Sequence, residues 1–393
     1  MKLMIIGFGQ CGSRIADEFA KLNKKAKAKR GLEIITDAFA VDTDPAVLDS
    51  LHTIKPDSQH RILIESGRTD GHEVVRMSEL GAEIAIDNSN RVIDAIRAAE
   101  RLFETDAFLL VAGVAGGTGS GGIPVMAQSI KDFYKDKPLY SLAVLPFKDE
   151  EGTEERTIYN AAISLKSLYS VADAVFVADN QRYVTKDPAL RDNLPRINEL
   201  IVEPFYDLLC AGEEEKAKYI GASIADAGDI IQTLSGWTAI GYGSGKLKLP
   251  PFGLPFGRWR SFRKKAAKRR VGIQAMEAAI SQLSVGCDPA DAGSALYLVL
   301  APAGEMKVEL FHELGSYLKG IAQGAVIRSC DYPRGKGAVD VTVILSRLSS
   351  VERIKGYYDV VGGLMRKIKM RQAEIESKVR AMEAASRKIP SLL

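Results

Sequence analysis

Short aliphatic runs alternate with longer amphipathic, charged segments along the first half of the chain. The aliphatic runs have the length of buried strands, and the intervening segments place apolar residues at helical spacing. We expect strands at residues 2–7, 34–41, 61–65, 107–112, 139–146 and 174–178. Helices are expected between them, at residues 11–21, 90–103 and 123–133. This alternation predicts an α/β fold built on a parallel sheet.

An uninterrupted helical pattern follows, with apolar positions at Ile197, Leu200, Ile201, Phe205, Leu208 and Leu209. It predicts a long helix at residues 195–209, packed inside the molecule. Beyond it we expect helices at 224–234, 264–283 and 305–321, and strands at 237–241, 296–301 and 340–345. The segment 243–262 is rich in Gly, Pro and aromatic residues and is expected to be a long exposed loop. Together these elements predict a second, smaller α+β unit.

A chain of 393 residues is long enough for two domains that each bury a core. The element pattern divides it into four parts. We expect a Rossmann-like parallel-sheet domain at 1–190, a central helix and connection at 191–222, an α+β domain at 223–350, and a charged C-terminal helix and tail at 351–393.

The overall charge and the cysteines exclude several classes of protein. A net charge of +3 supplies no general field for nucleic acid. The four cysteines are scattered and form no CxxC pair, which indicates reduced thiols. No segment resembles a signal peptide or a membrane span, because the longest apolar runs are only strand-length. We expect a cytoplasmic protein with no nucleic-acid partner and at most indirect membrane contact.

The run Gly116-Gly117-Thr118-Gly119-Ser120-Gly121 follows the predicted strand at 107–112. Glycines allow the backbone to approach an anion closely, and a helix that begins there would direct free N–H groups at a phosphate. The run lacks the lysine of the P-loop and lies far from the first strand, where a dinucleotide fingerprint belongs. It therefore predicts a phosphate site of another kind.

A second glycine pattern, Gly7-x-Gly9-x-x-Gly12, follows the first strand. This spacing alone is the Rossmann fingerprint, so an NAD-linked oxidoreductase is one alternative. The acidic partner of that fingerprint is expected about twenty residues further on. The nearest candidate, Asp42, comes about thirty residues on at the end of the next strand.

The two glycine loops resemble those of the tubulin/FtsZ superfamily. GGTGSG at 116–121 is similar to its GGGTG[ST]G signature, and GQCGSRI at 9–15 is similar to the first loop of tubulin. AVDTD at 40–44 resembles a loop of FtsZ. The mixture of tubulin-like and FtsZ-like segments over residues 3–345 is most similar to the archaeal CetZ group. This resemblance implies a GTP-binding, GTP-hydrolysing cytoskeletal protein with a role in cell shape or division.

The resemblance also implies which residues hold the nucleotide. They are Gly9, Gln10, Cys11, Gly12, Ser13, Arg14, Gly81, Ala82, Gly116, Gly117, Thr118, Gly119, Ser120, Gly121, Glu151, Arg156, Asn180 and Asn198. Asn180 and Asn198 suit guanine, because an amide offers both a donor and an acceptor. Glu151 is expected on the ribose, with Glu154 or Glu155 as alternatives. Asp42 and Glu83 are acids near the expected phosphates to which we assign no role.

The segment 223–231 carries Asp226 and Asp229 and resembles the catalytic loop of FtsZ. In that family the loop enters the pocket of the next subunit, where its acids position water. A helix cap at Asp226 is the alternative interpretation. Contacts of this kind are head-to-tail and build filaments. Mg²⁺ would be held through phosphates and water without a dedicated protein metal site.

The resemblance implies one further contact, and one alternative function stays open. Neighbouring protofilaments would meet through the segment 243–270, which includes the basic run at 258–270. A scaffold that binds GTP but does not hydrolyse it remains the alternative to a GTPase.

Overall fold

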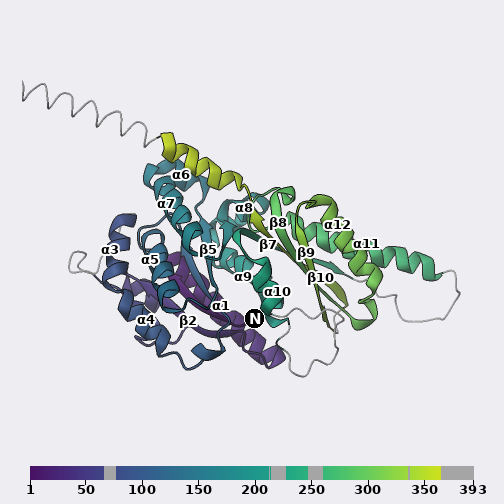
Figure 1. Cartoon of the computed structure of the whole chain (residues 1–393), viewed down its shortest axis with the longest axis horizontal. Helices are drawn as coiled ribbons and strands as arrows, with labels where there is room; N and C mark the ends of the chain where they lie inside the picture. Colours follow the sequence, from purple (N-terminus) through teal and green to yellow (C-terminus); the bar gives the residue numbers. More distant parts are fainter. Residues whose placement is uncertain (66–76, 212, 214–226, 247–259, 335–336, 364–393) are drawn as a thin grey trace, which may run out of the picture.

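One sheet of ten strands runs through the described part of the molecule, in the order β3-β2-β1-β4-β5-β6-β7-β10-β8-β9. The structure is a computed structural model that describes residues 1–65, 77–211, 213, 227–246, 260–334 and 337–363. In Figure 1 the first half of the chain forms one end of the molecule and the second half the other.

The six strands of the first half are parallel to one another. They are β1 (Leu3–Phe8), β2 (Ile35–Asp42), β3 (Arg61–Leu63), β4 (Ala107–Gly113), β5 (Leu139–Leu145) and β6 (Ala174–Asp179). Alternate residues of β1 enter separate cores, with Leu3 and Ile5 on one face and Met4 and Ile6 on the other. The strands of a parallel sheet that is buried on both faces have continuous aliphatic sequences, as these strands do. The predicted α/β class is confirmed.

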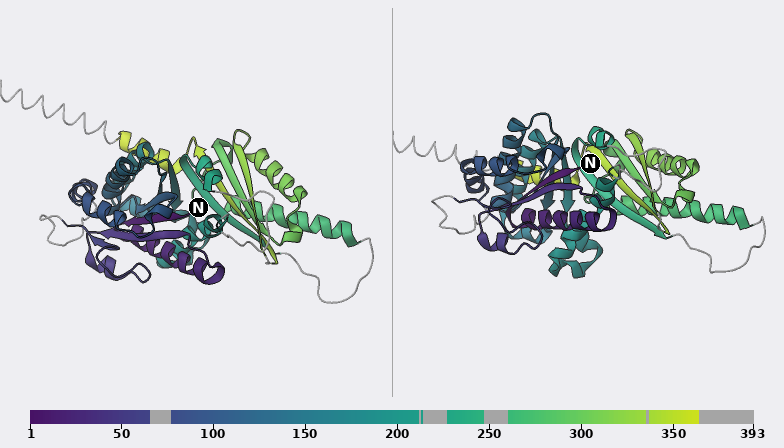
Figure 2. Two further views of the ribbon diagram at one scale, coloured as in Figure 1. Left: turned by 60° about the horizontal axis from the view of Figure 1, so that its bottom comes forward. Right: turned by 90° about the horizontal axis from the view of Figure 1, so that it is seen from below.

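Helices cover both faces of this sheet (Figure 2). The first group comprises α1 (Gly9–Arg30), α2 (Pro45–Asp49), α3 (Ser78–Asp87), α4 (Ser89–Arg97), α5 (Thr118–Phe133), α6 (Lys148–Thr153), α7 (Glu155–Val171), α8 (Asn180–Lys186) and α9 (Leu194–Cys210). α9 confirms the long helix predicted at 195–209. It packs on α1 and β6 through Phe205, whose ring meets Phe19 at 5.3 Å and Phe176 at 5.2 Å.

α1 is longer than the sequence predicted. It continues beyond residue 21 through a lysine-rich stretch to Arg30 and ends at Gly31, which has a φ of 69°. A left-handed glycine is a common helix terminus. The last turn is basic, which suits the negative end of the helix dipole.

The second half adds mixed strand pairing. It contains β7 (Gly236–Lys246), β8 (Ala292–Ala301), β9 (Val326–Pro333), β10 (Ala338–Leu348), α10 (Ala227–Thr233), α11 (Arg260–Ser281) and α12 (Val308–Ile321). β7 pairs in parallel with β6 and antiparallel with β10, so the sheet is continuous between the two halves. The predicted loop at 243–262 is too long at both ends, since β7 extends to Lys246 and α11 begins at Arg260. The domain limits stay a prediction.

The chain after β10 returns to the first half of the molecule. Residues 352–363 are helical, and this segment lies beside α6 and α7 in Figure 1. Its buried residues Ile354, Tyr357 and Val361 join the core on that face of the sheet. The remainder of the predicted C-terminal helix and tail lies outside the described residues.

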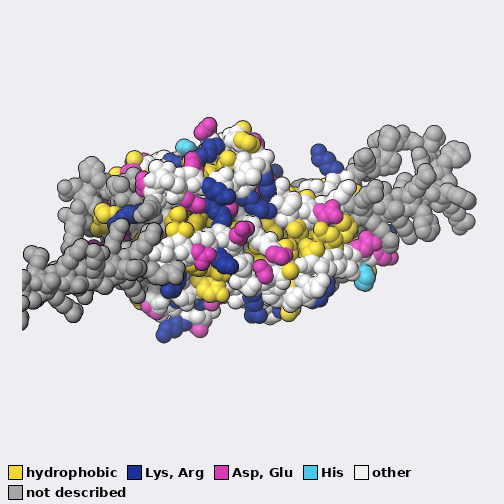
Figure 3. Space-filling model, turned by 90° about the horizontal axis from the view of Figure 1, so that it is seen from above, with side chains coloured by type: hydrophobic (Ala, Val, Ile, Leu, Met, Phe, Trp, Pro, Cys, Tyr) yellow, Lys and Arg dark blue, Asp and Glu magenta, His cyan; other side chains and the backbone are white. Residues whose placement is uncertain are grey.

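No helix within the described ranges is long and apolar enough to cross a membrane. On the face shown in Figure 3, basic and acidic side chains are intermixed with one another and with apolar ones.

Candidate functional site

A cavity of about 300 Å³ lies at the carboxyl ends of β1, β4 and β5. β1 has β2 on one side and β4 on the other, which is the point where strand order reverses and where ligands of such sheets bind. The lining residues are Phe8, Gly9, Gln10, Cys11, Arg14, Asp42, Asp44, Val47, Gly113, Ala115, Gly116, Gly117, Thr118, Gly119, Val144, Leu145, Pro146, Phe147, Glu150, Asn180, Leu194 and Asn198. Both predicted glycine loops and both predicted asparagines therefore meet at one cavity.

Two helix N-termini form one wall of the cavity. α1 begins at Gly9, which has a φ of 68°, and α5 begins at Thr118. The residues before them, Phe8 and Gly117, have no side chain that can accept a hydrogen bond, so neither caps its helix. The first N–H groups of both helices are thus available at the positive ends of two helix dipoles. This wall suits a phosphate chain.

Buried polar contacts fix the glycine loop in place. Asn160 on α7 is fully buried and donates from Nδ2 to the carbonyl oxygens of Ala115 at 3.1 Å and Gly116 at 3.4 Å. The hydroxyls of Thr43 and Thr118 are hydrogen-bonded at 3.0 Å. Sequence analysis gave Asn160 no role. The available signal was the segment Tyr159-Asn160-Ala161, which resembles a Y-N-A segment of tubulin.

Asp42 faces the phosphate wall and is almost fully buried. Its Oδ1 accepts from the backbone N–H of Thr43 at 2.7 Å and of Asp44 at 3.3 Å. These two backbone donors hold the Asp42 carboxylate in one orientation. Glu83, the other unassigned acid, is exposed on α3 and is not among the described residues that line the cavity.

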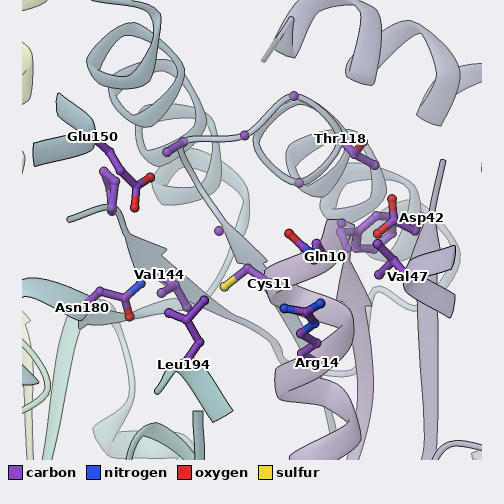
Figure 4. Close-up of a pocket in the computed structure, with 18 of the residues that line it drawn as sticks. Gln10, Cys11, Arg14, Asp42, Val47, Thr118, Val144, Glu150, Asn180 and Leu194 are labelled. Atoms are coloured by element: carbon purple, nitrogen blue, oxygen red, sulfur yellow. The ribbon is translucent and has the colours of Figure 1, made fainter. Parts of the chain in front are cut away.

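The opposite wall suits a nucleoside. In Figure 4 the amide of Asn180 and the carboxylate of Glu150 point into the cavity, with Val144 and Leu194 near Asn180. Asn180 is the first residue of α8, which is capped by the Asp179 carboxylate through the Gln181 N–H at 2.9 Å. The Cys11 sulfur also points inward. Burial raises the pKa of this thiol to about 12, so it stays protonated at neutral pH.

Glu151, the expected ribose ligand, faces away from the cavity. Its carboxylate pairs with Arg353 and accepts from the hydroxyl of Tyr357, both on the helix at 352–363. Glu150 lines the cavity in its place. One residue along a helix turns a side chain by about 100°, which separates these neighbours. Glu150 was not among the three glutamates that the sequence offered.

Several other predicted residues do not line the cavity in the described structure. They are Gly12, Ser13, Gly81, Ala82, Ser120, Gly121 and Arg156. A Cβ at Gly12 would overlap the carbonyl of Val111, and one at Gly121 would overlap the carbonyl of Ser78. The Ser120 hydroxyl donates to the carbonyl of Gly116. Arg156 is exposed and bonds Glu79 at 3.2 Å.

Asp229 lies on α10, near the ends of the strands that are opposite the cavity. α10 leads into β7, whose first residue Gly236 is level with Ala174 at the start of β6. Asp229 is therefore near the amino ends of the parallel strands, whereas the cavity is at their carboxyl ends. It cannot reach the cavity of its own chain. Asp226, the other predicted acid, lies outside the described residues, as do residues 247–259 of the predicted lateral contact at 243–270.

Comparisons with known proteins agree with this arrangement. A model of the Tubulin/FtsZ family GTPase domain matches residues 2–185, and a model of the Tubulin-like CetZ C-terminal domain matches residues 187–361. The tubulin-like protein CetZ3 of Haloferax volcanii is 32% identical over 364 residues, which cover 90% of each chain.

Solved structures give the same result. The GDP-bound CetZ1 monomer of Haloferax volcanii superposes with a TM-score of 0.76 at 30% identity, covering 93% of this chain and 100% of that one. The CetZ2 protofilament of the same organism, bound to GTPγS, has a TM-score of 0.76 at 27% identity, with 94% and 100% covered. The chain thus belongs to the tubulin/FtsZ family and, within it, to the CetZ group.

Proposed function

We propose that this chain binds GTP and GDP in the cavity at the ends of β1, β4 and β5. The observation that supports this most strongly is the pairing of two helix N-termini on one wall with two asparagine amides on the other. Helix N-termini suit phosphates, and amides suit guanine. A GDP-bound structure of the similar CetZ1 supports the same assignment.

Each wall has a distinct part in this proposal. Gln10 and the backbone of residues 116–119 hold the phosphates, with Arg14 adding positive charge from α1. Asn180 and Asn198 pair with the guanine base, and Glu150 accepts hydrogen bonds from the ribose hydroxyls. The neutral Cys11 thiol packs between the two parts. An NAD-linked oxidoreductase is not proposed, because the matching domain model is that of a GTPase.

Hydrolysis is proposed to use acids from the adjacent subunit. Asp229 is at the edge of the sheet opposite the cavity, so only a second chain stacked head-to-tail can bring it to a bound nucleotide. There Asp229 and Asp226 would orient and deprotonate the attacking water. A head-to-tail contact does not close on itself, so it extends into a protofilament. The GTPγS-bound CetZ2 protofilament supports this arrangement.

Mg²⁺ is proposed to reach the site with the nucleotide. Asp42 and Asp44 are carboxylates that line the cavity, and Asp44 already caps α2 through the N–H of Ala46. Hard cations prefer oxygen ligands. Asp42 would hold water of the hydrated ion, and the ion would neutralise charge on the phosphates. A task in cell shape or division within the cytoplasm, and lateral contacts through 243–270, complete the proposal.

The proposed hydrolysis by acids of the adjacent subunit is tested by measuring GTP turnover as a function of protein concentration. GTPase activity per chain should rise steeply with concentration and be lost in Asp229→Ala, and electron microscopy should show filaments with GTP and fewer with GDP. Activity per chain that is independent of concentration would rule out catalysis in trans. Filaments and tight GTP binding without turnover would favour a non-hydrolysing scaffold instead.

A further inference from the structure

A single guanidinium ties the C-terminal helix to the nucleoside wall of the cavity. Arg353, on the helix at 352–363, pairs through one terminal nitrogen with the Asp179 carboxylate. Its other terminal nitrogen pairs with Glu151 and donates to the carbonyl of Pro146 at 3.1 Å. The side chain is 15% exposed, so these bonds form in a largely desolvated setting.

Each of the three partners of Arg353 either lines the cavity or is next in sequence to a residue that does. Asp179 caps α8 and precedes Asn180, and Glu151 follows Glu150 on α6. Pro146 lines the cavity itself, at the end of β5. The two segments are also joined directly, because the backbone N–H of Lys148 donates to Oε1 of Gln181 at 3.1 Å.

The C-terminal helix is held on this site by more than one contact. Ile354, Tyr357 and Val361 are buried in the core at helical spacing. The hydroxyl of Tyr357 donates to Glu151 and accepts from Arg353 at 2.8 Å. The helix that carries Arg353 is therefore held in place. The planar guanidinium of Arg353 then sets the spacing between the carboxylates of Asp179 and Glu151.

Loss of Arg353 would disturb both segments together. Asp179 and Glu151 would face each other without a cation, and burial already raises the pKa of Asp179. Two carboxylates in a desolvated site repel, and removing one partner of a buried ion pair is strongly unfavourable. Separation of these carboxylates would move Asn180 and Glu150 out of register with each other.

From this geometry we infer that Arg353 is a positioning residue for the nucleoside, and that docking of the helix at 352–363 is coupled to nucleotide binding. This inference rests on the proposed GTP site. Arg353 contacts residues beside the cavity and acts through Asn180 and Glu150. Coupling is reciprocal, so bound nucleotide must also stabilise the docked helix.

Affinity and selectivity of the full chain test the inference. We expect Arg353→Met to bind GDP roughly tenfold more weakly, within the roughly 5- to 150-fold range typical of coupling between two sites. Its preference for GDP over IDP and over 2′-deoxy-GDP should shrink, because base and ribose contacts are misplaced. Arg353→Lys keeps the charge without the fork and should be intermediate. General loosening of the fold would weaken all three nucleotides equally.

Arg334→Met is the matched control. Arg334 is 13% exposed and pairs with Asp207 at 2.6 Å, and neither residue lines the cavity. The GDP affinity and the nucleotide preferences of Arg334→Met should match those of the wild type. If Arg353→Met does not fold, Tyr357→Phe retains the ring and removes one hydroxyl bond, and should lower GDP affinity by a smaller factor.

Hydrogen exchange of the wild-type chain gives a second readout. GDP should slow amide exchange in residues 352–363 relative to the nucleotide-free chain. Failure of the wild type to bind GDP would overturn the proposed function. Wild-type affinity or unchanged preferences in Arg353→Met, or exchange at 352–363 that GDP does not slow, would overturn the inference and leave the GTP site standing.

Discussion

Asn160 on α7 bonds the carbonyl of Ala115, 45 residues earlier in the chain, at 3.1 Å. The same amide reaches the carbonyl of Gly116. A glycine-rich loop has few side chains of its own to hold it in one conformation. A helix from the neighbouring layer therefore supplies the restraint.

Asn160→Ala should lower the free energy of unfolding by about 1–3 kcal/mol, because loop carbonyls lose a buried donor. It should also weaken GDP binding, since the loop must then be ordered by the nucleotide. Chemical denaturation and nucleotide titration measure the two effects. Ser170→Ala, which removes an exposed hydroxyl of the same helix, should change neither. Stability lost with no change in GDP affinity would show that the loop needs no such restraint.

Gly121→Ala tests a packing role for the predicted phosphate-loop signature. The new methyl group would overlap the carbonyl of Ser78, so α3 and α5 would have to separate. We expect a loss of about 1–3 kcal/mol, typical of overpacking, measured by thermal unfolding. Gly320→Ala on α12 has no atom within 4 Å of the added Cβ and should be neutral or slightly stabilising. Equal stability of the two variants would contradict the close approach of α3 and α5.

These glycines show where sequence reasoning succeeded and where it stopped. The motifs lie in the two loops that meet at the cavity, and Gly9 and Gly117 line it. Gly12 and Gly121 belong to the same motifs but are required by neighbouring backbones. A sequence can indicate that glycine is needed, but the atom that excludes a Cβ lies on another element.

The same reasoning applies to the fold. Buried parallel strands are continuous aliphatic runs, so their positions were predictable. The charged end of α1 was missed, because lysines at helical spacing resemble a solvated loop as much as a helix. Arg353 and Asp179 are 174 residues apart, and no local pattern links them. The sequence likewise could not show that Glu150, and not Glu151, lines the cavity. That depends on the side of α6 on which the helix at 352–363 packs.

His60 predicts a pH dependence of stability. Its ring is buried, stacks on Phe39, and bonds Asp37 at 3.3 Å and Asp57 at 2.6 Å. The bond to Asp37, aided by Asp57, raises the pKa of His60 above its usual 6.5, against the effect of burial. A raised folded-state pKa gives a stabilisation that is complete below pH 6.5 and is lost as pH rises through the folded-state pKa.

Urea unfolding at a series of pH values from 6 upward should show this decline in the wild type. In His60→Gln the corresponding slope should be absent, because glutamine does not titrate. A decline of the same size in both chains would assign the pH dependence to other groups.

Glu150→Ala tests the proposed contact between Glu150 and the ribose. The carboxylate points into the cavity, so its loss should weaken GDP binding by roughly tenfold, the effect of one good charged hydrogen bond. It should also remove most of the preference for GDP over 2′-deoxy-GDP. Glu154→Ala, on an exposed residue of the same segment, is the matched control and should bind as the wild type does. Retention of the preference in Glu150→Ala would return the ribose role to another residue.

Mixing two inactive variants tests whether one site is shared by two chains. Asp229→Ala keeps its cavity and lacks one of the two proposed catalytic acids, and we expect its turnover to fall by on the order of 10²-fold. Asn198→Ala keeps Asp229 on α10 and loses guanine binding, so it too should be inactive alone. In a mixture, Asp229 of one chain can enter the nucleotide-filled cavity of the other. GTPase activity should therefore reappear on mixing and rise with the concentration of either variant. No recovery in mixtures that still form filaments would contradict catalysis across the subunit contact.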